Sequence, residues 1–214
     1  MKRLVFLVEG NSELTFVHQF VIPYLYGLGF QNPMNAQTII TNRKQHKKGG
    51  VVNYDYLKND LKRIIAQGNV IVTTLIDFFK LPPSFPNYTT DAQHISDIEQ
   101  GVLEDFEYNP DLIPYIQKHE FEALMFSEID GFEIVIDDDK KLQKIRDIIA
   151  EFPNPEDINS SPQKAPSKRL KSIFNYEKVE DSELIFEMLD IQSILDKCPR
   201  FKTWIEKIIA KLKE

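Results

Sequence analysis

The sequence contains a single cysteine, Cys198, and no long apolar run. One cysteine cannot form an intrachain disulfide or a cysteine-rich zinc site, so the disulfide-stabilised and zinc-finger classes are excluded. We expect its thiol to be buried in an apolar helical segment. The first apolar run, LVFLV, ends at Glu9 and is much shorter than a signal-peptide core or a membrane span. We therefore expect a cytoplasmic protein with no membrane partner.

Positive charge is also in short supply, because 26 lysines and arginines face 33 acids and give a net charge of -7. Such a chain is not a basic nucleic-acid coat protein. A local basic groove on an acidic protein can still bind a nucleic-acid backbone. The 42% apolar and 11% aromatic content is enough for a packed core and excludes a disordered chain. We expect residues 1–130 to form an α/β core and residues 131–214 a helical extension packed on it, as one structural unit.

Short apolar runs alternate with amphipathic segments through the first part of the chain. Strands are predicted for LVFLV, AQTIIT, NVIVTTLID and LIPYIQ, the last at an edge or broken because it contains Pro114. Helices are predicted for 12–24, 54–68 and 91–106, with another opening at HEFEALMF. This alternation is typical of an α/β fold with a largely parallel sheet flanked by helices. Later segments predict a short strand in GFEIVID and a terminal helix in CPRFKTWIEKIIAKLKE.

Acids follow the two clearest strands. Glu9 follows LVFLV and precedes Gly10, which permits a tight turn and close ligand approach; Glu13 lies near the next helical turn, and Asp77 ends NVIVTTLID. The carboxyl ends of parallel strands meet at one sheet edge, where carboxylates repel one another unless a cation such as Mg²⁺ or Mn²⁺ lies among them. This pattern predicts a metal-dependent active site. The structural alternative is that Glu9 caps the following helix and Glu13 belongs to a capping box.

The segment HEFEALMF supplies His119, Glu120 and Glu122. The two glutamates share a face in an extended chain and not in a helix. His119 is a candidate metal ligand, phosphate donor or general base, and its structural alternative is an ordinary hydrogen-bonding role. The spacing is not the HExxH of zinc proteases, so that class is rejected.

Two segments carry clustered positive charge. In APSKRLK, Pro166 and Ser167 favour a helix start, which places Lys168 and Arg169 where an anion such as phosphate binds. The alternative is a solvated helix face. The basic segment RKQHKK, residues 43–48, also suits phosphate contact, although such runs are usually solvated loops.

The segments LVFLVEGNSE and LIDFF together resemble a Toprim domain, a Rossmann-type α/β fold that binds Mg²⁺ between a glutamate after its first strand and an Asp-x-Asp after its third. With LIPYIQKHEFEALMF, PEDIN, APSKRL and CPRFKTWIEKI, nearly the whole chain is similar to the bacterial, Toprim-like domain of unknown function 4276 family. The resemblance matches Glu9 to the glutamate and Asp77 to the first aspartate. Phe79 stands where the second aspartate is expected, so Glu120 or Glu122 is the candidate replacement.

This resemblance implies a Mg²⁺- or Mn²⁺-dependent nuclease that acts on DNA or RNA, as an effector of a bacterial defence system coupled to an AAA-type or ABC-type ATPase. The expected roles are metal binding by Glu9, Asp77 and Glu120 or Glu122, proton transfer or water positioning by Glu13 or His119, and phosphate binding by Lys168 and Arg169.

Two other functional classes stay open at this point. Phe79 favours a non-catalytic binding or regulatory subunit of an ATPase complex. The shortage of basic residues near the proposed acids leaves open a phosphatase or nucleotidyl enzyme for small phosphate esters.

Overall fold

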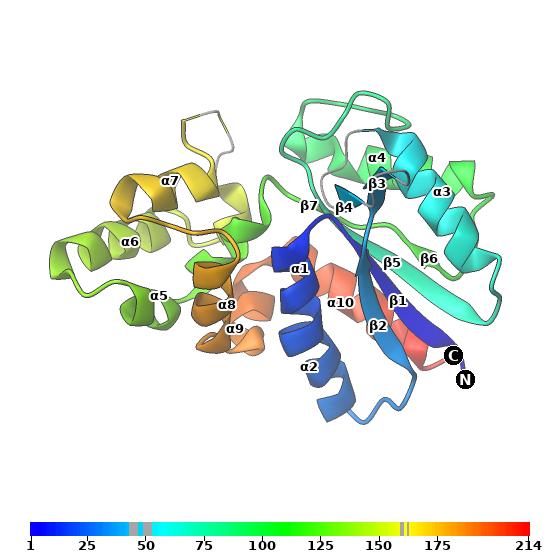
Figure 1. Cartoon of the computed structure of the whole chain (residues 1–214), viewed down its shortest axis with the longest axis horizontal. Coiled ribbons are helices and arrows are strands. Elements are labelled where there is room, and N and C mark those ends of the chain that lie inside the picture. The colour runs from blue at the N-terminus through cyan, green and yellow to red at the C-terminus, as the bar shows by residue number, and fades with distance from the viewer. Residues whose placement is uncertain (43–46, 49–52, 159–160, 162) are drawn as a thin grey trace. The chain divides into compact units, whose positions relative to one another are not determined.

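The computed structural model describes the whole chain except residues 43–46, 49–52, 159–160 and 162 (Figure 1). The chain divides into two compact units. Unit 1 contains residues 1–117 together with 204–214, and unit 2 contains residues 118–203. Each unit is described by itself below.

A parallel sheet forms the centre of unit 1. Its strands are β1 (Arg3–Val8), β2 (Met34–Thr38), β5 (Val70–Asp77), β6 (Leu112–Ile113) and β7 (Ile116–Gln117). The order is β2-β1-β5-β6, with β7 also paired to β5, and every pair is parallel. All eight residues of β5 are buried, as expected for a strand covered on both faces. The predicted α/β class with a parallel sheet is confirmed.

The edge of this sheet is interrupted where Pro114 separates β6 from β7. Proline lacks the backbone N–H that a continuous strand would need. At this break, the side chains of two threonines of β5 make hydrogen bonds to the backbone of the edge segment. The Thr74 hydroxyl accepts a hydrogen bond from the Tyr115 N–H at 2.7 Å and donates to the Tyr115 carbonyl at 2.8 Å. The Thr73 hydroxyl donates to the Ile113 carbonyl at 2.7 Å. The predicted break at Pro114 is confirmed.

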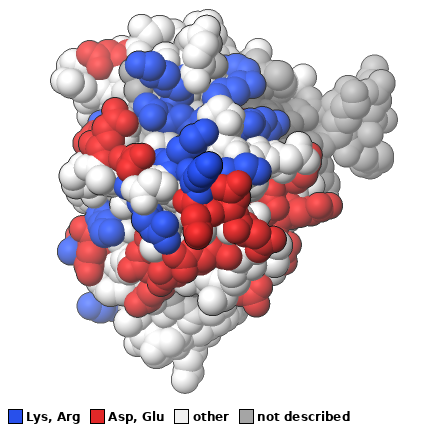
Figure 2. Space-filling model, turned by 90° about the vertical axis from the view of Figure 1, so that its left-hand side faces the viewer, with Lys and Arg blue, Asp and Glu red and all other residues white. Residues whose placement is uncertain are grey.

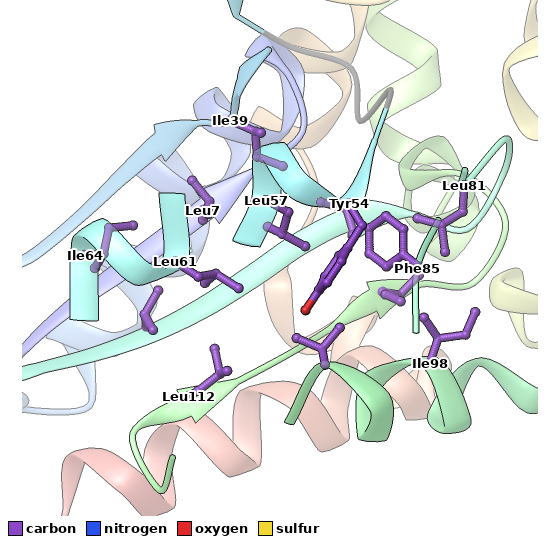
Figure 3. Close-up of a cluster of buried hydrophobic side chains, with 14 of the residues drawn as sticks. Leu7, Ile39, Tyr54, Leu57, Leu61, Ile64, Leu81, Phe85, Ile98 and Leu112 are labelled. Atoms are coloured by element: carbon purple, nitrogen blue, oxygen red, sulfur yellow. The ribbon is translucent and has the colours of Figure 1, made fainter. Parts of the chain in front are cut away.

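Helices cover the sheet of unit 1. They are α1 (Asn11–Phe16), the π-helical turn η1 (Val17–Val21), α2 (Ile22–Gly27), α3 (Tyr54–Ile65), the 3-10 turn η2 (Ala92–His94), α4 (Ile95–Asp105) and the part of α10 (Pro199–Leu212) from Trp204 on. Figure 3 shows Leu57 and Leu61 of α3 and Ile98 of α4 in one buried cluster with Leu7 of β1. This amphipathic packing explains the helical spacing of the apolar residues in the sequence.

Trp204 anchors α10 to the sheet. Its indole N–H donates to the Thr73 hydroxyl at 2.7 Å, and its ring stacks on Tyr115 with centroids 4.6 Å apart. The Phe6 ring meets it edge-on at 6.0 Å. The predicted strand AQTIIT is divided between β2 and β3 (Ile40–Asn42), and β3 pairs antiparallel with β4 (Lys47–Lys48).

Unit 2 is helical in the residues that the structure describes. Its elements are the 3-10 segment η3 (Phe121–Ser127), α5 (Asp130–Val135), α6 (Asp139–Glu151), the 3-10 turn η4 (Pro155–Asp157), α7 (Pro166–Ile173), α8 (Glu180–Glu187), α9 (Ile191–Lys197) and the first residues of α10. Aromatic pairs fill its core, with Phe121 and Phe186 centroids 4.9 Å apart and Phe126 and Phe132 centroids 5.3 Å apart. Cys198 is buried between α9 and α10, as expected.

The prediction of a strand in GFEIVID is wrong, because residues 131–135 belong to the helix α5. The physical reason is the packing of α5 against α8. A Cβ atom at Gly131 would lie only 2.4 Å from the Ile185 carbonyl oxygen, so glycine permits a close helix contact there. Asp138 then accepts hydrogen bonds from the N–H groups of Lys140 and Lys141 and starts α6. Across the described ranges, no helix combines the length and apolarity that a membrane crossing needs.

Candidate functional site

The order of the strands in unit 1 creates a topological switch point. After β1, the chain first forms β2 on one side of β1 and later forms β5 on the other side of β1. Ligands of open α/β sheets bind outside the carboxyl ends of the strands at such a point. Glu9 follows β1 directly and Asp77 is the last residue of β5. Two of the predicted metal ligands therefore lie at the position that the fold itself favours for a ligand.

Glu9 and Asp77 are joined by a hydrogen bond. The Glu9 carboxylate oxygen Oε2 accepts from the Asp77 backbone N–H at 3.0 Å, and the Glu9 backbone N–H donates to the Leu75 carbonyl at 3.1 Å. The side chain of Glu9 thus extends from the end of β1 to the end of β5. Asp77 is only 8% exposed. The structure brings these two predicted acids together.

Glu13 lies beside the same turn, in the first part of α1. Its side chain is buried, and its Oε2 atom is 3.0 Å from the position that a Cβ atom would take at Gly10. A larger residue at position 10 would have to push this carboxylate aside by a few tenths of an ångström. The residue that caps α1 is Gly10, which offers no side-chain oxygen. Glu9 directly after β1 and Glu13 in the first turn of α1 therefore flank the same glycine turn.

The residues that follow Asp77 are aromatic. Phe78 is buried in the core and Phe79 is half-buried. The Lys80 ammonium lies 5.1 Å from the centre of the Phe79 ring, a cation–π contact. Position 79, where the Toprim resemblance leads us to expect a second aspartate, thus carries no ligand atom. Among the residues that the structure describes, no group of three or more acids, histidines or cysteines is arranged to hold a metal ion.

Glu120 lies in unit 2 and caps a helix. One of its carboxylate oxygens accepts from the Ser167 backbone N–H at 2.9 Å, and the other accepts from the Ser167 hydroxyl at 3.0 Å. Ser167 is in the first turn of α7. This helix start was predicted to bind an anion, and the anion that it contacts in unit 2 is a carboxylate of the chain itself.

The neighbours of Glu120 are also held within unit 2. Glu122 is fully buried, and its carboxylate lies 3.3 Å from the Lys178 ammonium. His119 is partly buried with its backbone in the left-handed region, at φ 64°. Burial, assisted by the positive charge of Lys118, lowers the pKa of His119 to about 4, and the opposing effect of Asp157 is smaller. Its imidazole is therefore neutral at pH 7.

The two predicted phosphate-binding residues differ in their surroundings. Arg169 donates to the Lys164 carbonyl at 3.0 Å, and its guanidinium lies 5.0 Å from the centre of the Phe152 ring. Lys168 is exposed in the first turn of α7. The basic segment 43–48 falls largely outside the described residues. Figure 2, which looks onto the end of the molecule that carries α5 and α6, shows Lys and Arg side chains gathered above a group of Asp and Glu side chains.

Glu156 is a buried acid that the sequence analysis did not single out. Glu156 is 1% exposed, and its two carboxylate oxygens accept from the backbone N–H groups of Arg200 at 2.8 Å and Phe201 at 3.1 Å. Burial raises the pKa of Glu156, and the two N–H groups oppose this shift. The sequence feature that could have indicated such an acid is the start of α10. Cys198 and Pro199 offer no capping oxygen, so the first N–H groups of that helix need an acceptor from elsewhere.

The fold defines an α/β protein with a Rossmann-like parallel sheet, and its acids gather at the switch point. Residues 8–209 match the family model described as Domain of unknown function (DUF4276). The chain belongs to this family. No curated protein and no solved structure matches the sequence.

Proposed function

We propose that this protein hydrolyses phosphodiester bonds of nucleic acids with a divalent cation, Mg²⁺ or Mn²⁺, held at the switch point of unit 1. The hydrogen bond from the Asp77 N–H to the Glu9 carboxylate carries the proposal, because it joins two acids at the edge where α/β sheets bind ligands. The Toprim resemblance supports it, since Glu9 follows the first and Asp77 ends the third strand of the parallel sheet in chain order.

The donor atoms present at this edge suit the cation. Mg²⁺ prefers oxygen ligands, commonly uses only one or two protein carboxylates, and keeps water or phosphate oxygens in its other positions. Glu9 and Asp77 meet that requirement without a third carboxylate. When bound, the cation would polarise the phosphate and lower the pKa of a bound water. The Asp77 N–H fixes the Glu9 carboxylate, and we assign to Glu13 the positioning of a water molecule or the acceptance of its proton.

Unit 2 contributes differently to this proposal. Exposed Lys168 is suited to contact a phosphate backbone as a point charge. His119 is a poor general base near neutral pH, because its conjugate acid has a pKa of about 4. Glu120 and Glu122 have partners within unit 2. We therefore assign the metal to the carboxylates of unit 1, and the resemblance supports a role as the nuclease of an ATPase-coupled bacterial defence system.

A second candidate function is a non-catalytic Toprim-like subunit that binds nucleic acid or an ATPase partner. Phe79 favours it, because the position of the second Toprim aspartate packs a ring against Lys80 and offers no ligand. This candidate predicts the same fold without saturable binding of a divalent cation.

Calorimetric titration with Mg²⁺ and Mn²⁺ separates the two functions. The wild type is compared with the double variant Glu9→Gln, Asp77→Asn. A control double variant, Asp55→Asn, Glu104→Gln, changes two exposed acids of α3 and α4. We expect saturable binding by the wild type and the control only. Cleavage of single- and double-stranded DNA and RNA should fall at least about 100-fold in the Glu9, Asp77 variant, the upper range for the loss of a supporting metal-site residue.

Each result bears on one of the two functions. Equal metal binding and equal cleavage by all three proteins would exclude the proposed site. Absence of both binding and cleavage in the wild type would favour the non-catalytic subunit. Circular dichroism should be the same for all variants, because the substitutions preserve side-chain volume.

A further inference from the structure

Unit 2 exposes four large apolar side chains among its described residues, and all four lie on α5, on α8 or at the ends of α8. They are Ile134, Val179, Leu184 and Met188, each between 42% and 49% exposed. Single exposed apolar side chains are ordinary on protein surfaces. Three of the four, Val179, Leu184 and Met188, belong to α8 or its two ends, so α8 concentrates the exposed apolar side chains of this unit.

The exposed face of α8 has a regular pattern. Glu180, Leu184, Glu187 and Met188 are exposed and have the spacing i, i+4, i+7 and i+8, which places them on one side of a helix. The buried side chains of α8, such as Ile185, point to the core of unit 2. Apolar and acidic groups therefore alternate along the solvent face. Methionine adapts its shape to different apolar partners, which suits a docking position.

The charges of α8 indicate which charge a binding partner of this face would carry. The helix carries Glu180, Asp181, Glu183 and Glu187 and no lysine or arginine. Three of these acids lie in the first turn, where the helix dipole favours them, whereas Glu187 at the carboxyl end opposes the dipole. A cationic partner would relieve the unfavourable interaction at Glu187. An apolar strip between carboxylates thus fits a helix whose leucine-type anchors are flanked by lysine or arginine.

We propose that the face formed by Glu180, Leu184, Glu187 and Met188, the α8 surface, docks a basic amphipathic helix of a partner protein. The proposal does not depend on the metal site, because it uses residues of unit 2 alone. The apolar side chains would provide contact area, and the carboxylates would steer the partner and select its charge.

A labelled model peptide tests this inference. The probe is a fluorescein-labelled helical peptide with leucines at i, i+4 and i+8 and lysines at most other positions, and fluorescence anisotropy measures its binding to the full-length protein. We expect saturable binding that weakens with added salt. Replacing Leu184→Ser and Met188→Ser together should weaken it at least about 10-fold. The control Leu28→Ser changes an equally exposed leucine of unit 1 and should leave binding unchanged.

A charge-reversal variant is the second test of this proposal. The variant Glu180→Lys, Glu187→Lys should lose the lysine peptide and bind a version in which glutamates replace the lysines. Equal binding by the Leu184, Met188 variant and the wild type would overturn the proposal, as would equal binding of a peptide whose leucines are replaced by serine. A wild-type dimer in sedimentation that the Leu184, Met188 variant abolishes would instead assign the surface to a second copy of the chain. Circular dichroism confirms that the variants are folded.

Discussion

Acids of the two units are buried to similar extents and use their oxygens in different ways. In unit 2, Glu120 and Glu156 each accept hydrogen bonds through both carboxylate oxygens from the start of a helix. In unit 1, the Glu9 carboxylate accepts from the backbone of another acid, Asp77, at the edge of the sheet. Glu120 and Asp77 differ little in exposure, at 7% and 8%.

Burial alone therefore does not separate a structural acid from a candidate ligand; the hydrogen-bond partner does. A helix start has N–H groups that need acceptors, so a carboxylate there lowers the free energy of the folded state. Two acids at a strand end repel each other, which a protein tolerates when a ligand compensates. The comparison predicts that Glu120 and Glu156 of unit 2 act on stability and that Glu9 and Asp77 of unit 1 act on metal binding.

The largest expected effect on stability is that of Glu156→Ala. Two buried N–H groups of α10 would lose their acceptor, so the free energy of unfolding should fall by about 2–4 kcal/mol. Urea denaturation measures this change. Exposed Glu206→Ala on the same helix is the control and should change it by less than about 0.5 kcal/mol. An unchanged stability in Glu156→Ala, or a loss of divalent-cation binding with stability intact, would contradict the structural role of Glu156.

The fold was largely predictable because its strands and helices have strong local signals. The run NVIVTTLID is apolar and β-branched, and it became the buried strand β5. Pro114 predicted the break between β6 and β7, because proline has no backbone N–H to donate within a strand. The strand predicted in GFEIVID failed because α5 depends on the contact of Gly131 with α8, which no local pattern contains.

The candidate site was predictable only where strand ends define it. Glu9 and Asp77 follow apolar runs, and parallel pairing brings such ends to one edge. The pairing of Glu120 with Ser167 and of Glu156 with the start of α10 joins residues far apart in the sequence. Their local surroundings have no feature that distinguishes an acid that caps a remote helix from an acid that binds a metal.

The second prediction concerns pH and extends the comparison to the imidazole of unit 2. The pKa of His119 is about 4 in the folded protein, below its usual value of 6.5, so the unfolded chain binds the proton first as pH falls. This contribution to stability is present above pH 6.5 and is lost as pH falls toward 4. Because the side chain is partly exposed, we expect a loss of about 1–2 kcal/mol, less than the full shift implies.

Urea denaturation at pH 7, 5.5 and 4.5 measures this loss. The wild type should lose more stability across this range than His119→Gln, which lacks the titrating group. The control His18→Gln removes an exposed histidine of unit 1 and should follow the wild type. Parallel curves for the wild type and His119→Gln would show that the imidazole is not desolvated in solution.

The smallest expected effect is the coupling between Glu120 and Ser167, which tests the capping role most directly. In a double-mutant cycle with Glu120→Ala and Ser167→Ala, the interaction free energy should be about 1 kcal/mol, the usual net value for one hydrogen bond. The backbone N–H of Ser167 survives in Ser167→Ala, so the cycle reports only the hydroxyl bond. For that reason Glu120→Ala alone should cost more, about 1–2 kcal/mol. Additive effects combined with weaker Mg²⁺ binding by Glu120→Ala would move Glu120 from the helix caps to the metal ligands, and would remove the distinction between the two units.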